Sequence, residues 1–237
     1  MATVRNGTSV TGNLGVGASI LAAARTLDTR IIKARLAAFE AAQRTYSTGH
    51  DKVHTAEAQL GAAQLRLDEL DAQQDQAVEA LAAALIVDGQ PRTNAFAAYG
   101  VPAPGKLMNL PVADEAKAVH QLVAAVQRGR GVSKPTLQAA QAAQKAARAI
   151  EQALVEMEKR QNVVREARHT RDAVAQTWAT ALAALKRGAR AAADEGAPTL
   201  YATLFDRPQR PNGKNGKSPK AAAAPVPAPT PEPANPA

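Results

Sequence analysis

Apolar residues recur at every seventh position through the first third of the chain. Of eight successive positions in this series, only Gln74 is polar. The series is Ile32, Phe39, Tyr46, Val53, Leu60, Leu67, Gln74 and Leu81. A sustained seven-residue repeat indicates a helix that packs along a partner helix. We therefore expect an all-α protein built around long, paired helices in a coiled coil.

The second half of the chain carries a similar repeat. Its members are Ile150, Met157, Val164, Trp178 and Leu185, with Arg171 interrupting the series. Ser133 is a suitable N-cap for this helix, and Pro135 suits its first turn. Each long helix would extend about 85 Å at 1.5 Å per residue. The segment between them is too short to travel back over that distance, so the two helices should be antiparallel.

Charge supports this pairing. Residues 51–88 contain eight acidic and two basic side chains, whereas residues 134–190 contain five acidic and eleven basic ones. Opposite charges along the seam favour this partner and this register. The register brings together two groups: Asp51, His54 and Glu57 on the first helix, and Arg165, Arg168 and Arg171 on the second.

We predict three regions: a flexible Gly-rich leader at residues 1–18, a helical hairpin domain at 19–206, and a disordered Pro/Ala/Lys-rich tail at 207–237. The hairpin domain should contain helix 1 (19–87, continuous through Gly49), an irregular loop (88–113), a short helix (114–128), helix 2 (134–195) and an aromatic clasp (199–205). A faint repeat at an offset of 101 residues, seen in the Ala-Ala-Gln of 41–43 and 142–144, raises the hypothesis of an internal duplication.

Composition excludes several classes of protein. The chain has no Cys, so disulfides, thiolate catalysis and Cys-ligated zinc are excluded. The longest strongly apolar stretch, residues 80–87, is far short of the roughly 20 residues of a membrane span. Residues 14–24 make a poor signal peptide because Gly, Thr and Asn surround them and Arg5 alone precedes them. We expect a cytoplasmic protein.

One Gly-rich segment resembles a phosphate-binding loop in its spacing. Residues 12–19 place a Gly, four residues, a second Gly and then Ser19 at a possible helix start. The position that requires Lys is Ala18, and no apolar strand precedes the segment. We therefore interpret it as part of the leader.

Two carboxylate-to-His pairs have the spacing found in di-iron bundles. They are Glu166 with His169 and Asp51 with His54. On the expected seam, Glu166 and His169 point outward and three Arg surround them, which favours solvated side chains. His50 and His54 are one turn apart, but exposed helical histidines are much commoner than metal ligands. We expect no metal and no cofactor.

Nothing in the sequence indicates catalysis. The chain lacks a Gly-flanked Ser elbow, and no carboxylate pair lies on an evident cleft. A two-helix rod also offers no large apolar pocket. We expect a protein that is not an enzyme.

A basic end of the rod and a basic tail are the features most suited to an anionic ligand. The net charge is +8, so phosphates would be attracted without reading of base sequence. The candidate contacts are Arg30, Lys33, Arg35, Lys186, Arg187, Arg190, Arg207, Arg210, Lys214, Lys217 and Lys220. No aromatic residue interleaves the basic residues of the tail, so base stacking is not indicated.

The sequence favours a structural or protein-interaction module that self-associates. An Ala-rich helix pair buries little area, so Phe39, Tyr46, Met157 and Trp178 should stay partly exposed unless a second hairpin covers them. We expect a homodimer that forms a four-helix bundle, or another helical protein as partner. The alternatives are a sequence-independent nucleic-acid-binding accessory protein and a helix-coated surface such as a lipid or storage granule.

Overall fold

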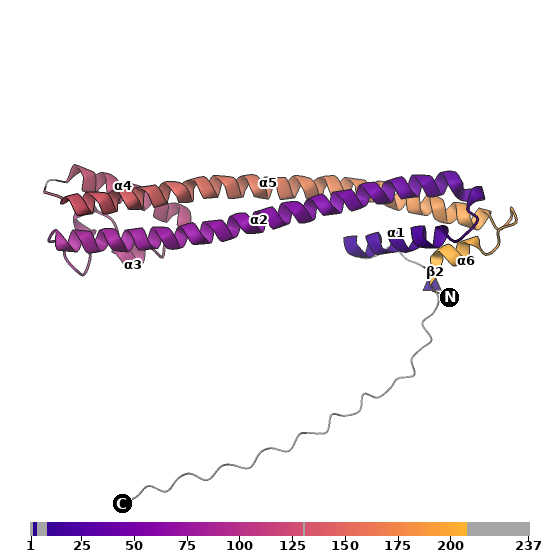
Figure 1. Cartoon of the computed structure of the whole chain (residues 1–237), viewed down its shortest axis with the longest axis horizontal. Helices are drawn as coiled ribbons and strands as arrows, with labels where there is room; N and C mark the ends of the chain where they lie inside the picture. The colour runs from indigo at the N-terminus through magenta and orange to yellow at the C-terminus, as the bar shows by residue number, and fades with distance from the viewer. Residues whose placement is uncertain (1, 4–8, 130, 208–237) are drawn as a thin grey trace, which may run out of the picture.

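The fold is an elongated antiparallel pair of two long helices (Figure 1). The computed structural model describes residues 2–3, 9–129 and 131–207. Helix α2 spans Lys33–Val87 and helix α5 spans Lys134–Ala191, and each packs along the other for most of its length. The all-α hairpin predicted from the heptad is confirmed. The predicted tail lies outside the described residues from position 208 onward.

The register of the two helices also follows the prediction. Helix α2 continues without a break through Gly49. Arg168 donates to Glu57 with an Nη2–Oε1 distance of 2.6 Å, which confirms the expected contact between these two segments. At the turn end of the hairpin, the Ser133 backbone N–H donates to Asp88 Oδ2 at 3.0 Å. This bond joins the end of α2 to the start of α5.

Short elements occupy the connection between the long helices. Helix α2 ends at Val87, and Gly89 turns the chain two residues later with a φ of 94°, a left-handed value that is easily adopted only by Gly. The connection then contains the 3-10 helix η2 (Ala97–Tyr99), helix α3 (Pro104–Leu107) and helix α4 (Val112–Arg128). Helix α4 begins two residues before the predicted position. It packs mainly on α5 and also contacts η2.

The leader predicted at residues 1–18 is wrong from residue 10 onward. Helix α1 spans Val10–Ala24, and the Ser9 side chain accepts a hydrogen bond from Gly12 N–H at its start. A turn and the 3-10 helix η1 (Arg30–Ile32) then separate α1 from α2, so helix 1 does not begin at residue 19. Glycines lower the helix propensity of this segment. Burial of Val16, Ile20 and Ala24 on one face supplies the missing stability.

The other side of this end is closed by the C-terminal segment. Helix α5 ends at Ala191, four residues earlier than predicted, because residues 192–196 form a turn. The segment predicted as an aromatic clasp at 199–205 folds back on the rod as helix α6 (Leu200–Phe205), which packs on α5 and α1. A two-residue antiparallel pairing joins β1 (Ala2–Thr3) to β2 (Asp206–Arg207).

Two separate apolar cores result, one at each end of the rod. At one end α1 and α6 cover Phe39, Tyr46 and Trp178, which are 0, 2 and 1% exposed. The expectation that these three aromatic side chains stay partly exposed is therefore wrong, because the sequence did not reveal the covering helix α1. Met157 is half-buried, as expected. At the other end α4 buries Val119, Leu122 and other side chains against α2 and α5.

The order of the elements repeats along the chain. A helix of 15 residues (α1) precedes the 55-residue α2, and a helix of 17 residues (α4) precedes the 58-residue α5. The start of α4 lies 102 residues after that of α1, and the start of α5 lies 101 residues after that of α2. The hypothesis of a duplication therefore gains support from the arrangement of the helices.

Candidate functional site

The middle of the rod lacks the third layer of helices that covers each end. Residues 47–66 of α2 and 158–173 of α5 belong to neither apolar core. In Figure 1 the short helices lie at the two ends, and only α2 and α5 cross the middle. The two helices still bury Val53, Ala56 and Val164 between them. This bare stretch is the candidate interaction surface, and we call it the mid-rod.

A shallow groove follows one side of the mid-rod. Its volume is about 560 Å³, and it is open along its length. Its walls combine small or apolar side chains with a few charges: Thr48, Gly49, Asp51, Lys52, Thr55, Ala56 and Gln59 from α2, and Val163, Glu166, Ala167 and Thr170 from α5. Val163 is 49% exposed, although it is a large apolar residue. An open groove of this shape is suited to binding another helix, whereas a small molecule usually binds in an enclosed pocket.

Polar contacts on both sides of the mid-rod fix how α2 and α5 lie together. Arg168 binds Glu57, and Arg160 Nη1 donates to Gln59 Oε1 at 2.7 Å. The hydrogen bond from Arg168 holds the pKa of Glu57 below its usual value. A second groove of about 620 Å³ runs beside this pair and includes Leu60 and Gly61. The charged residues Glu57, Arg165 and Arg168 also line this groove.

Gly49 lets the backbone of α2 approach α5 at the edge of the mid-rod. A Cβ at this position would lie 3.4 Å from the Arg171 Cα. Arg171 interrupts the apolar series of α5, and its side chain is only 17% exposed while its guanidinium pairs with Asp172. The small Gly49 therefore leaves room for the large polar side chain of Arg171 in the seam. The sequence placed Arg171 in the seam as the break in its apolar series, and its low exposure agrees with that position.

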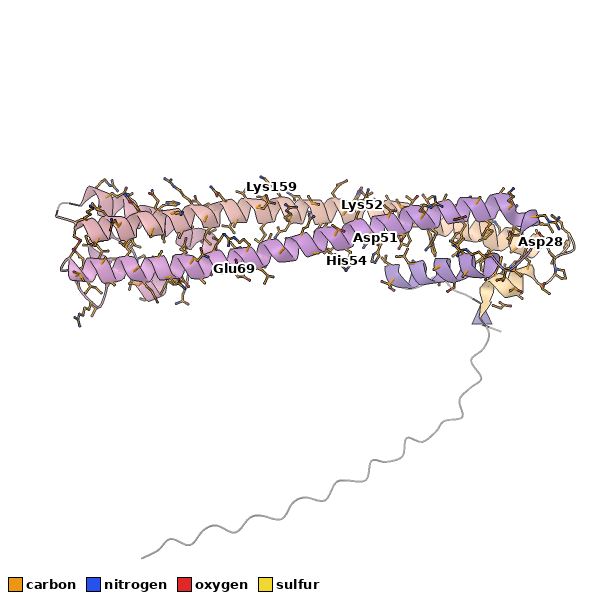
Figure 2. All side chains as sticks on the ribbon, in the orientation of Figure 1. Asp28, Asp51, Lys52, His54, Glu69 and Lys159 are labelled. Atoms are coloured by element: carbon orange, nitrogen blue, oxygen red, sulfur yellow. The ribbon has the colours of Figure 1, made fainter. Side chains whose placement is uncertain are left out.

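The predicted basic end is formed only in part. Arg35 packs against Gly188, so α2 and α5 do bring basic residues to the same end. Arg30 pairs instead with Asp28, which Figure 2 labels at this end of the rod. Lys33 and Arg187 are exposed. The side chain of Arg207 and the whole of Arg210, Lys214, Lys217 and Lys220 lie outside the described part of the chain.

Two of the basic residues lie on aromatic rings of α6. Lys186 Nζ is 5.8 Å from the centroid of the Phe205 ring. The Arg190 guanidinium is 4.7 Å from the Tyr201 centroid and also donates to the Tyr201 hydroxyl at 2.9 Å. Burial lowers the pKa of Lys186, and the neighbouring charge of Arg190 acts in the same direction. These contacts hold α6 on α5 and give both side chains a structural role.

The other candidate segments from the sequence lie inside a helix or on the exposed surface. Residues 12–19 lie inside α1, so they do not form a loop that cradles phosphate. Asp51 and His54 lie on the exposed surface of the mid-rod (Figure 2). Glu166 and His169 are also exposed, as expected. Among the residues that the structure describes, no three His, Cys, Asp or Glu side chains come together in a way that could hold a metal ion.

Two buried polar residues were not identified as important from the sequence. Gln43 accepts a hydrogen bond from Trp178 Nε1 at 2.6 Å and donates one to the Leu14 carbonyl at 3.1 Å, so it joins α1, α2 and α5. Glu115 is 1% exposed at the start of α4 and lies next to the buried Gln74. Gln74 was visible as the polar break in the heptad. No pattern in the sequence pointed to Gln43.

Comparison with known proteins gave no relatives for this chain. No family model, no curated protein and no solved structure matches it. Within the described ranges, no helix is long and apolar enough to cross a membrane.

Proposed function

We propose that this protein is a non-enzymatic, cytoplasmic structural module that self-associates through the mid-rod groove. The observation that carries this proposal is the bare middle of an otherwise covered rod. Both ends have a third helix that completes an apolar core, whereas the mid-rod exposes Val163 beside an open groove. A helix pair in this situation gains stability when a further pair of helices covers it.

Charge favours one orientation of a second copy as the occupant. Within the mid-rod, residues 158–173 of α5 contain five basic and three acidic side chains, a net charge of +2, whereas residues 47–66 of α2 contain two of each and no net charge. A two-fold axis parallel to the rod would place α2 of one copy over α5 of the other, in antiparallel orientation. This arrangement keeps the two positively charged α5 segments from facing each other.

The area of the mid-rod is sufficient for a modest interface. Twenty residues of helix extend about 30 Å, and two helices side by side are about 20 Å wide. One face therefore offers roughly 600 Å² per copy, or about 1,200 Å² in total, which is at the lower limit of stable interfaces. We expect a reversible dimer with a micromolar dissociation constant.

Sedimentation equilibrium of the full chain at about 1–100 µM tests this proposal. We expect a monomer–dimer equilibrium that Val163→Glu weakens at least tenfold. The matched control is Val87→Glu, which alters another exposed valine at the end of α2, outside the groove. Circular dichroism would verify that both variants fold. A wild-type chain that remains monomeric at 100 µM, or equal loss of dimer in both variants, would overturn the proposal.

Binding of nucleic acid at the basic end is the second candidate. The observation in its favour is that the exposed Lys33, Arg35 and Arg187 lie at the same end of the rod. Fluorescence anisotropy with duplex DNA at about 50 mM salt tests it, with an expected log–log salt slope of about −0.9 per phosphate contacted. Lys33→Glu with Arg187→Glu should weaken binding, and Lys145→Glu at the far end should not. No binding at tens of micromolar protein rejects this function.

A further inference from the structure

A cluster of buried acids and one amide lies where α4 begins. Glu115 of α4 is 1% exposed and Gln74 of α2 is fully buried. Asp71 and Asp75 flank Gln74 on α2 and are half-buried. Five buried polar atoms of this cluster have no hydrogen-bond partner: Asp71 Oδ1, Gln74 Oε1, Gln74 Nε2, Asp75 Oδ1 and Glu115 Oε1. Buried polar atoms are normally paired, so this concentration is unusual.

The charges around Glu115 on α2 all have the same sign. Within the described residues, Asp71, Asp75, Glu79 and Glu115 form no ion pair with a basic side chain. Burial raises the pKa of Glu115, and the carboxylates of Asp75 and Asp71 raise it further, while the Gln74 amide offsets part of this rise. Burial, followed by Asp71 and Glu79, likewise raises the pKa of Asp75.

The other elements near α4 do not neutralise these acids. On α4 itself, Asp114 pairs with Lys117, and His120 lies 3.3 Å from Glu151 of α5. On α5, Arg148 is exposed at the level of Gln74, and on α3 Lys106 is exposed. Neither pairs with a described carboxylate. The remaining titratable neighbour is Tyr99 of η2, whose pKa is raised by burial and by Asp88.

We propose that the cluster makes the docking of α4 depend on pH. When Glu115 or Asp75 is protonated, its O–H can donate to the other carboxylate, and the buried acceptors gain a donor. When both are ionised, two carboxylates face each other in a site without a cation. The first two turns of α4 then loosen from the rod, while the end that contains α1 is unaffected.

The direction of the pH dependence follows from linkage. A carboxyl group with a raised pKa binds more protons in the folded state than in the unfolded state. The docked state therefore loses stability as pH rises from the ordinary carboxyl value of about 4.3 through the raised pKa of the cluster. Above that pKa the whole loss is present. The docked state of α4 should therefore be more stable below the raised pKa of the cluster than above it.

Loosening α4 would uncover an apolar surface of defined position. Ala116 and Val119 on the first two turns of α4 are fully buried, as are Leu81 and Ala140 on the long helices. All belong to the core at this end of the rod. Loosening of α4 would therefore expose apolar residues at one end of the rod, away from the mid-rod groove. This inference is independent of the proposed self-association.

Hydrogen exchange on the full chain tests the proposal. We expect peptides that cover residues 112–120 to exchange at least tenfold faster at pH 8 than at pH 5, after correction for intrinsic rates. Peptides from α1 should show no such change. Glu115→Gln should abolish the difference, because its amide mimics the protonated acid. Asp75→Asn provides a second variant if Glu115→Gln does not fold.

His120 requires a control because it lies 3.3 Å from Glu151 at the same junction, and this contact is an ion pair only when His120 is protonated. His120→Gln should retain at least half of the tenfold difference if the acid cluster is responsible. Loss of the whole difference in His120→Gln assigns the effect to His120 and rejects the proposal. Equal exchange of residues 112–120 at both pH values in the wild-type chain also rejects it.

Discussion

The buried amide of Gln43, at the end that contains α1, has a partner on each side. Its Oε1 accepts from Trp178 and its Nε2 donates to the Leu14 carbonyl. The buried amide of Gln74, at the end that contains α4, has no partner for either atom. Both residues lie on α2, and each lies beneath a short covering helix. A buried glutamine therefore has satisfied hydrogen bonds at one position of α2 and unsatisfied ones at another.

This difference shows that a buried polar side chain stabilises the fold only when neighbouring groups satisfy its hydrogen bonds. At the α1 end, Gln43 links three helices and specifies how the glycine-rich α1 is placed. At the α4 end, Gln74 and its acidic neighbours reduce stability, because each unpaired buried group costs about 1–3 kcal/mol. We expect the stability of the α1 end to change little with pH and the stability of the α4 end to depend on it.

The largest expected effect comes from Trp178→Ala. Trp178 lies between Phe39 and Tyr46, with ring centroids 5.9 and 5.7 Å away. Its removal leaves a cavity and also leaves Gln43 Oε1 without its donor. We expect a loss of about 3–5 kcal/mol in the free energy of unfolding, measured by urea denaturation and circular dichroism. A loss below about 1 kcal/mol would show that α1 does not depend on this core.

Replacing each buried glutamine by leucine should have opposite effects. Gln43→Leu leaves the Trp178 N–H and the Leu14 carbonyl unpaired, so we expect a loss of about 1–3 kcal/mol. Gln74→Leu removes two polar atoms without hydrogen-bond partners at similar volume, but it also removes the amide that lowers the pKa of Glu115. Where Glu115 is protonated only the first effect remains, so we expect a gain of about 1–3 kcal/mol at acidic pH. Urea denaturation at pH 5 measures both variants. If the two changes have the same sign, the contrast between the ends is wrong.

Two glycines of α1 offer a finer test of the α1 end. A Cβ on Gly17 would meet the amide of Gln43, whereas a Cβ on Gly15 would meet nothing within 4 Å. Gly15→Ala should stabilise the protein by about 0.5–1 kcal/mol through helix propensity. Gly17→Ala should instead destabilise it by about 1 kcal/mol, because displacement of Gln43 outweighs the same gain. Thermal unfolding followed by the fluorescence of Trp178 distinguishes the two variants.

The long helices could be predicted because their signal is long. An apolar series that continues in phase from Ile32 to Leu81 does not depend on any single contact. The length of the connection then determined the antiparallel direction, and charge indicated the register. Helix α1 was not predicted, because Gly12, Gly15 and Gly17 lower its intrinsic propensity and only packing on α2 and α6 compensates.

The polar contacts at the two ends could not be predicted for a related reason. Gln43 and Trp178 are 135 residues apart in the sequence, and their contact depends on the side-chain geometry of one layer. Glu115 looks like an ordinary acidic residue in the first turn of a helix. Its burial depends on how α4 docks, which no periodic pattern reveals. Gln74, as the polar break in the heptad, was the single local sign of this cluster.

The smallest expected effect concerns the mid-rod, which has only two layers. Arg168 lowers the pKa of Glu57 through a hydrogen bond. This pair therefore contributes stability at neutral pH, and the contribution disappears as pH falls through the lowered pKa. Glu57→Gln should reduce the unfolding temperature by less than any destabilising change above, because the pair is exposed and screened by salt. Glu69→Gln, which breaks a pair within α2, is the matched control. A loss after Glu57→Gln as large as that after Gln43→Leu would mean that polar contacts hold the middle as firmly as packing holds the ends.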